Sequence, residues 1–290
     1  MLTLRVGGVA EHYNLPWHLL IESEKLSAIG VELQWIDCPG GTGEMTSYLN
    51  ANELDMAVLL TEGMVTSFMK GSQAKIASIF VKSSLEWGVH SSRSNPFVPG
   101  ETKPVTIAIS RKGSGSHLMA LLYLRRKGIA LENVRFKEVG SLAGALQAFD
   151  RLEVDLFLWE KYTTEPYCSS HDLALIDSIF TPWPCFVIAV REAFYKQHRE
   201  KVSRLLSEVF READLLKQDT NAVDLISERY HLSRNRVNKW FEKVVWGDGE
   251  NLSVQEVNEV IDQLRDAGNF EVDKKRSEPH EMLLEKQLIF

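Results

Sequence analysis

The chain alternates between short apolar runs and longer stretches in which apolar residues recur every third or fourth position. The short runs are typical of strands, and the amphipathic stretches are typical of helices. Strand-like and helix-like segments alternate along most of the chain, but the pattern after residue 196 is mostly helical. The predicted strands are 2–6, 31–35, 55–60, 74–81, 85–90, 105–109, 134–139, 154–158, 173–179 and 185–190; the main predicted helices are 44–50, 118–127, 141–149, 196–217, 221–230, 234–244 and 254–267.

Two breaks in composition divide this alternation. Residues 91–104 are rich in Ser, Asn, Pro and Gly, and the second break is Thr181-Pro-Trp-Pro184. Strands that alternate with helices imply an α/β fold with mixed, mainly parallel sheets and helices on both faces. The breaks therefore predict two lobes joined by two crossovers that form a hinge. We expect lobe one to comprise 1–91 and 183–290, with a helical C-terminal part, and lobe two to comprise 92–182.

The second half of the chain repeats the first. Leu54-Asp-Met-Ala-Val-Leu-Leu-Thr-Glu62 matches Val154-Asp-Leu-Phe-Leu-Trp-Glu160 in pattern. Each is a buried strand that begins after Asp and leads into a helix that begins at Glu. The two stretches occupy matching places in the two halves, which supports two similar lobes.

Charge and composition exclude several classes of function. The chain has 290 residues, 33 Lys and Arg, 40 Asp and Glu, and a net charge of −7, with no basic stripe for nucleic acid. Residues 234–241 could form a DNA-reading helix, but their acidic surroundings favour a plain surface helix. The three cysteines show no metal-ligand spacing, so we expect no metal site and no cofactor.

No stretch of the sequence is apolar enough to span a membrane. The N-terminal residues read directly as a strand, without the basic and apolar segments of an export signal. As written, the sequence predicts a cytoplasmic protein; removal of a leader from a periplasmic protein would leave the same pattern.

Two small-residue loops stand at matching places in the two halves. Gly40-Gly-Thr-Gly43 and Gly113-Ser-Gly-Ser-His117 each follow a predicted strand and precede a helix. Ligands of open α/β sheets bind beyond the carboxyl ends of the strands, where helix N-termini favour negative charge. Each loop alone is compatible with a tight turn and a helix cap. Together they predict a cleft that binds one polar or anionic small molecule.

Other polar residues follow predicted strands at the same end of each sheet. His12 could act as a base oriented by Glu11, or the two could be polar lining of the cleft. Glu62 and Glu160 could recognise a cationic or donor group, or could simply stabilise helix starts. Trp159 could stack on a ligand, or pack the hinge.

Several of these segments together resemble the type-2 periplasmic-binding-protein superfamily. The resemblance is strongest to its sulfonate, taurine and thiamine-precursor branch, the substrate-binding proteins of ABC transporters, of which the chain looks like a leaderless member. The segments that carry it are Val6-Gly-Gly-Val-Ala-Glu-His12, Pro39-Gly-Gly-Thr-Gly43, 55–63, Ile109-Ser-Arg-Lys-Gly-Ser-Gly-Ser-His117, Phe157-Leu-Trp-Glu160 and Thr181-Pro-Trp-Pro184.

The resemblance implies a two-lobed type II fold that closes around its ligand by hinge motion. It implies a small-molecule ligand as partner and, if the protein is exported, an ABC permease. Carried over residue by residue, the implied ligand-binding residues are Glu11, His12, Gly41, Thr42, Thr61, Glu62, Ser114, Ser116, His117, Trp159 and Glu160.

The sequence leaves two classes of function open. The first is non-catalytic binding, by a solute receptor or a cytoplasmic sensor. The alternative is a cytoplasmic enzyme on the same fold, such as a lyase or a synthase similar to those of thiamine or menaquinone biosynthesis. The cysteine cluster of the related thiamine-precursor synthases is absent from this chain.

Overall fold

A computed structural model describes residues 1–98, 104–267 and 278–284. Parts of the predicted loop at 91–104 and of the C-terminal part of lobe one lie outside the described residues. The chain divides into two compact units. Unit 1 comprises Met1–Ser83, Trp183–Asp262 and Glu271–Phe290, and unit 2 comprises Ser84–Pro182 and Gln263–Phe270. Residues 84–91, which the sequence analysis placed in lobe one, fall in unit 2 because their strand pairs only within the sheet of that unit.

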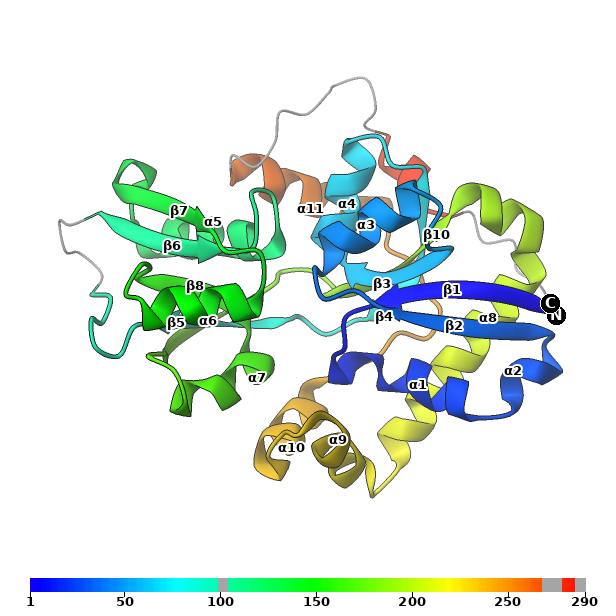
Figure 1. Cartoon of the computed structure of the whole chain (residues 1–290). Helices are drawn as coiled ribbons and strands as arrows, with labels where there is room; N and C mark the ends of the chain where they lie inside the picture. The colour runs from blue at the N-terminus through cyan, green and yellow to red at the C-terminus, as the bar shows by residue number, and fades with distance from the viewer. Residues whose placement is uncertain (99–103, 268–277, 285–290) are drawn as a thin grey trace. The chain divides into compact units, whose positions relative to one another are not determined.

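Unit 1 is built on a five-stranded sheet with the strand order β2-β1-β3-β10-β4 (Figure 1). β1 is parallel to β2 and to β3, while β10 is antiparallel to β3 and β4. The central strands β3 and β10 are almost wholly buried, which explains their unbroken apolar sequences. The strands are β1 (Leu2–Gly8), β2 (Val31–Asp37), β3 (Met56–Leu60), β4 (Ala74–Val81) and β10 (Phe186–Arg191).

Unit 2 contains a second five-stranded sheet with the equivalent order, β7-β6-β8-β5-β9. β6 is parallel to β7 and β8, and β5 is antiparallel to β8 and β9. The expectation of mixed, mainly parallel sheets is confirmed in both units. In each sheet the single antiparallel strand is the one that follows a crossover. The strands are β5 (Glu86–Ser91), β6 (Val105–Ile109), β7 (Val134–Glu138), β8 (Leu156–Glu160) and β9 (Ala174–Phe180).

Helices connect the strands in both units, as Figure 1 shows. The longest helix, α8, carries a kink at His198, where the backbone leaves helical geometry. The α-helices are α1 (Leu15–Glu22), α2 (Lys25–Ala28), α3 (Thr42–Asn50), α4 (Thr61–Met69), α5 (Gly115–Lys127), α6 (Leu142–Asp150), α7 (Lys161–Thr164), α8 (Glu192–Gln218), α9 (Ala222–Tyr230), α10 (Arg234–Lys243) and α11 (Val254–Asp266); the 3-10 helices are η1 (His12–Asn14), η2 (Leu131–Asn133), η3 (Glu165–Ser169) and η4 (Pro279–Met282).

The repeat seen in the sequence corresponds to an equivalent set of contacts at the amino end of β3 and of β8. The Asp55 carboxylate accepts a hydrogen bond from the Arg5 backbone N–H (3.0 Å), and the Asp155 carboxylate accepts one from that of Thr106 (2.7 Å). Each Asp also donates its own N–H to the carbonyl of the same partner. Asp55 and Asp155 therefore extend the pairing of β3 with β1 and of β8 with β6 by one residue each.

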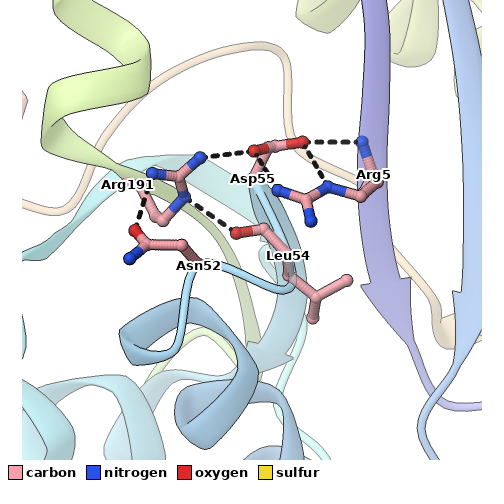
Figure 2. A network of polar contacts seen from close by, with 5 residues as sticks. All are labelled: Arg5, Asn52, Leu54, Asp55 and Arg191. Atoms are coloured by element: carbon pink, nitrogen blue, oxygen red, sulfur yellow. Dashed lines mark hydrogen bonds and ion pairs between the residues drawn. The ribbon is translucent and has the colours of Figure 1, made fainter.

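Only Asp55 also binds arginine side chains, and its carboxylate lies between two guanidinium groups (Figure 2). Arg5 comes from β1, and Arg191 from the end of β10. Arg191 also donates to the Leu54 carbonyl and to the Asn52 side chain. The cluster thus ties the middle of β1 to the amino end of β3 and the carboxyl end of β10.

The turn before each of these acids contains a residue with positive φ. Asn52 (φ 62°) and Leu152 (φ 54°) occupy equivalent positions, and their N–H groups bond to Leu49 and Phe149 respectively. Asn tolerates the left-handed region, whereas for most side chains it costs roughly 1–2 kcal/mol. Leu152 is also 61% exposed, so little packing offsets this cost.

We expect Leu152→Asn to raise the free energy of unfolding by about 0.5–1 kcal/mol, because it relieves backbone strain at an exposed site. Urea unfolding followed by circular dichroism measures the change. Arg151→Asn is the matched control, because Arg151 is exposed and has an ordinary φ of −94°. An equal effect of the two substitutions would show that strain at Leu152 is not the cause.

Candidate functional site

The carboxyl ends of β1, β2, β3 and β4 lie at one edge of the unit 1 sheet, where β10 begins. We call this the carboxyl edge of unit 1. The unit 1 residues that the sequence singled out follow these strands directly: Glu11, His12, Gly41, Thr42, Thr61 and Glu62. The fold therefore brings all six to the same edge. Their role in binding stays a prediction.

The two threonines at this edge fasten helix starts to the sheet. The Thr42 hydroxyl accepts from the Leu60 N–H at 3.2 Å, and the fully buried Thr61 hydroxyl donates to the Pro184 carbonyl. A Cβ on Gly63 would lie 2.2 Å from the Thr42 methyl group, so only glycine lets α4 approach α3 this closely. Gly41 has a φ of 64° and nothing within 4 Å of an added Cβ, so its contribution is the turn conformation.

Glu62 is the most unusual group at this edge. Its side chain is 2% exposed, and its Oε2 accepts a hydrogen bond from Trp183 Nε1 at 2.9 Å. Burial raises the pKa of Glu62 to about 7, against the opposing effect of hydrogen bonds from its own backbone N–H and from Trp183.

His12 lies in an aromatic cluster. Its ring is 3% exposed, and its centroid is 4.9 Å from that of Tyr13 and 4.2 Å from that of Trp240. Burial lowers the pKa of His12 to about 3, so the imidazole is neutral. A general base that works near neutral pH needs a pKa near that pH. The environment of His12 therefore does not suit the catalytic role considered from sequence.

In unit 2 the equivalent edge holds the start of α5, which we call the α5 cradle (110–117). The Ser114 hydroxyl caps the helix by accepting the His117 N–H at 3.3 Å, and lies 3.0 Å from the Ser116 hydroxyl. The Ser116 hydroxyl in turn accepts the Ser110 N–H at 2.9 Å. The Gly113 N–H donates to His117 Nδ1 at 3.0 Å. Hydroxyl and backbone donors thus gather at a helix start, as anion sites require.

Arg111 belongs to the same cradle, and sequence reasoning did not select it. Its guanidinium is partly buried, and this burial lowers its pKa, while the charge of Glu138 opposes the shift. Within the described residues no hydrogen bond or ion pair engages the guanidinium. The signal available in the sequence was its position, two residues past the end of β6.

Glu160 and Trp159 end β8 at this edge, and their contacts are mainly structural. Glu160 is 4% exposed, and accepts from the N–H groups of Tyr162 (3.1 Å) and Thr163 (2.6 Å) and from the Thr163 hydroxyl (2.7 Å). Burial raises the pKa of Glu160 to about 7, while these bonds oppose the shift. The Trp159 ring stacks on Phe157 with centroids 5.4 Å apart.

Trp87, at the start of β5, is a further candidate. It is 4% exposed, and its Nε1 has no hydrogen-bond partner among the residues described. Its ring lies edge-on to Trp159, with centroids 6.5 Å apart. Trp87 pairs with Glu160 at the carboxyl end of β8, and a buried indole N–H without a partner at this edge favours contact with a ligand.

No group of three or more His, Cys, Asp and Glu side chains within 1–98, 104–267 and 278–284 is arranged to hold a metal ion. No helix in the described part of the chain has the length and apolar content needed to cross a bilayer.

The paired mixed sheets, with polar loops at their carboxyl edges, are the type-2 periplasmic-binding-protein fold, and the resemblance seen in the sequence is confirmed at this level. A family model described as "Ca3427-like PBP" matches residues 87–179. The Candida albicans CA3427 gene product, whose structure exhibits the generic periplasmic binding protein fold, superimposes with a TM-score of 0.84 at 24% identity, over 93% of this chain and 92% of its own.

Two bacterial binding proteins share the fold at lower identity. The alkanesulfonate-binding protein SsuA from Xanthomonas axonopodis pv. citri, bound to MOPS, gives a TM-score of 0.79 at 15% identity, over 98% of each chain. PhnD1 from Prochlorococcus marinus, in complex with methylphosphonate, gives 0.61 at 12% identity, over 92% of this chain and 99% of its own. No curated protein sequence matches the chain.

Proposed function

We propose that the protein binds a small polar or anionic organic solute without changing it chemically. The observation that carries the proposal is the α5 cradle, a helix start with three serine hydroxyls that also contains Arg111, whose guanidinium makes no hydrogen bond or ion pair within the described residues. A helix N-terminus and a guanidinium both favour a negative group. The site therefore offers a positive charge at a helix start whose hydroxyls and N–H groups are already ordered by their hydrogen bonds to one another.

The comparisons support a solute-binding role of this general kind. The SsuA protein described above is an alkanesulfonate-binding protein, and the structure of PhnD1 contains methylphosphonate. Both ligands carry a compact anionic group, as the α5 cradle would require. The proposal extends to hinge closure of the two units on the solute, and to an ABC permease as partner if the protein is exported. Small-angle scattering with and without ligand tests closure through the radius of gyration.

A thermal-shift screen of small sulfonates, phosphonates and carboxylates tests the binding itself. A ligand at a hundredfold excess over its Kd stabilises the folded state by about 2.7 kcal/mol, which the screen detects. Mass spectrometry of the recovered ligand after long incubation is expected to find it unchanged. Conversion of the ligand would instead support the enzyme alternative.

We expect Arg111→Gln to weaken the binding of an anionic hit by about ten- to a hundredfold, because a charge-assisted contact is lost. Isothermal titration calorimetry at constant ionic strength measures the change. Arg135→Gln is the matched control, since Arg135 is an exposed arginine of β7 in the same unit. Equal losses in the two variants would indicate a general effect of charge and would contradict a role for the α5 cradle.

A further inference from the structure

The outer strands of the two sheets differ in how their free edges are protected. An unpaired edge presents a row of N–H and C=O groups that can pair with another chain, so native proteins cover such an edge or place charges on it. The outer strand β2 of unit 1 carries the exposed Glu32 and Asp37, and the outer strand β7 of unit 2 carries the exposed Arg135 and Glu138. Both strands are therefore protected by charge.

β4, the other outer strand of unit 1, is covered by later parts of the chain. The Ile79 N–H donates to the Glu250 carbonyl at 2.8 Å, and the Ile76 carbonyl accepts the Leu284 N–H at 2.9 Å. The free edge of β4 is therefore already occupied by backbone groups of its own chain.

β9 occupies in unit 2 the place that β4 has in unit 1, but its free edge is not covered in this way. Within the described residues, no backbone group outside β5 pairs with residues 174–180. The strand also exposes three apolar side chains, since Leu175 is 37% exposed, Ile176 42% and Phe180 49%. An exposed apolar edge strand is suited to pair with another chain.

Ser178 identifies the backbone groups that face away from β5. Its carbonyl accepts the Arg126 guanidinium at 3.3 Å, and its N–H donates to the adjacent Asp177 carboxylate at 2.8 Å. In an antiparallel pair, residues that are bonded to the neighbouring strand alternate with residues that are turned away from it. Phe180 is turned away by this alternation, and Ile176 has no partner on β5 because the register shifts there.

We propose that β9 pairs antiparallel with β9 of a second copy of this chain, around a two-fold axis at Ser178. In this register Ile176 of each copy lies opposite Phe180 of the other, which gives two apolar cross-strand pairs. The outward N–H and C=O groups of these residues then bond between the copies. The two exposed side chains stand two residues to either side of Ser178, and this symmetry fits a second copy better than an unrelated peptide.

The charges beside β9 fit the same register. Lys127 binds the Asp177 carboxylate at 2.9 Å, and the exposed Arg126 reaches the edge from the same helix. Pairing displaces Arg126 from the Ser178 carbonyl, which costs little because a 3.3 Å bond is long. Asp177 of the second copy then lies opposite Ile179, where it can accept the displaced guanidinium. Each copy thus offers a cation to the carboxylate of the other.

The assembly should be closed and weak. A two-fold pairing uses both β9 edges, so it stops at a dimer whose joined sheet has the charged β7 strands at its outer edges. One strand pair buries less than the roughly 1,200–2,000 Å² of a stable interface, so we expect a Kd on the order of 10–100 µM.

Sedimentation velocity of the wild-type protein from about 5 to about 500 µM brackets this Kd. The weight-average sedimentation coefficient should rise with concentration and fit a monomer–dimer equilibrium. Ile176→Lys should weaken the dimer at least about tenfold, because the substitution removes both Ile176–Phe180 pairs at once. Leu131→Lys is the matched control, since Leu131 is 53% exposed in the same unit but lies outside β9. It should leave the equilibrium unchanged.

A cross-link tests the register without weakening the dimer. In a hydrogen-bonded antiparallel pair the two Cα atoms are about 5.5 Å apart, which is within the range of a disulfide. Ser178→Cys should therefore form a covalent dimer under mild oxidation, as read on a non-reducing gel. Ser207→Cys, at an exposed position on α8, and the wild type with its native cysteines are the controls, and neither should cross-link at this rate.

Each result decides a defined part of the proposal. A wild-type protein that stays monomeric throughout the concentration range overturns it, and leaves the edge to another extended chain. A dimer that is as strong in Ile176→Lys as in the wild type shows that β9 is not the interface. Cross-linking of Ser178→Cys no faster than the controls overturns the register, and growth beyond a dimer contradicts two-fold closure. The proposed function stands or falls separately, through the thermal-shift screen.

Discussion

Replacing Asp55 with asparagine is expected to lower the free energy of unfolding by about 3–5 kcal/mol. The Asp55 side chain is 5% exposed, and its carboxylate binds Arg5 Nε at 3.0 Å, Arg5 Nη2 at 2.9 Å and Arg191 Nη2 at 2.5 Å. Asparagine would leave two guanidinium groups facing each other across a neutral amide. Breaking a buried charge cluster by removing its central ion leaves uncompensated charge, which is why the cost is large. Denaturant unfolding followed by tryptophan fluorescence measures it.

The internal repeat provides the control. Asp155 makes the same backbone contact in unit 2, with Thr106 instead of an arginine as its partner. Asp155→Asn should therefore cost only about 1 kcal/mol, the worth of a single backbone hydrogen bond. Similar losses in the two variants would show that the arginines add nothing to the contact.

The stabilisation by Asp55 should also depend on pH. Burial works to raise its pKa, but the hydrogen bonds from Arg5 and Arg191 outweigh this, and the net pKa is lowered. A carboxyl group with a lowered pKa in the folded state stabilises the protein above its unfolded pKa of about 3.9. This stabilisation is lost as the pH falls through the folded pKa. The difference between wild type and Asp55→Asn should thus be constant near neutral pH and shrink in acid.

Gly144→Ala is expected to cost about 2–4 kcal/mol, although alanine is the better helix former. A Cβ at this position would lie 2.0 Å from the carbonyl oxygen of Val139. That carbonyl cannot easily move, because it accepts the Ser141 N–H at 2.9 Å and the N–H of the same peptide group, that of Gly140, is bonded to the Ser110 carbonyl at 3.0 Å. The start of α6 would shift, and with it Ser141, which caps the helix through the Gly144 N–H.

The control for this substitution is Gln147→Ala, on an exposed face of the same helix. Helix propensity alone predicts that Gln147→Ala is neutral or slightly stabilising. Thermal unfolding of both variants distinguishes the effect of helix propensity from the effect of the steric clash between a Cβ at position 144 and the Val139 carbonyl. A Gly144→Ala protein as stable as wild type would show that the backbone around Val139 relaxes.

Most of the fold could be predicted from the pattern of apolar residues. The strands were found because parallel and central strands are buried on both faces, which leaves runs such as Phe-Val-Ile-Ala-Val in β10. The placement of β5 could not be predicted in the same way. Its residues follow unit 1 in the sequence, and only hydrogen bonding to β8 and β9 assigns them to unit 2.

The candidate site was predictable in position but not in chemistry. Glu62 and Glu160 follow equivalent strands, and a sequence cannot show that one carboxyl group caps a helical turn while the other keeps an unused oxygen. His12 is polar in the sequence, yet Tyr13 and Trp240 surround it through contacts distant along the chain. Such differences arise from tertiary packing, which local patterns do not encode.

The position of β10 has a consequence for how the protein is made. Four strands of the unit 1 sheet are synthesised before residue 82, but β4 cannot join β3 until β10 enters between them at residues 186–191. Unit 2, whose five strands form one continuous stretch, can complete its sheet first. A growing chain therefore exposes unpaired edges on β3 and β4 while the whole of unit 2 is translated. Ribosome-bound chains that end just before β10 should be more prone to aggregation than chains that end just after it.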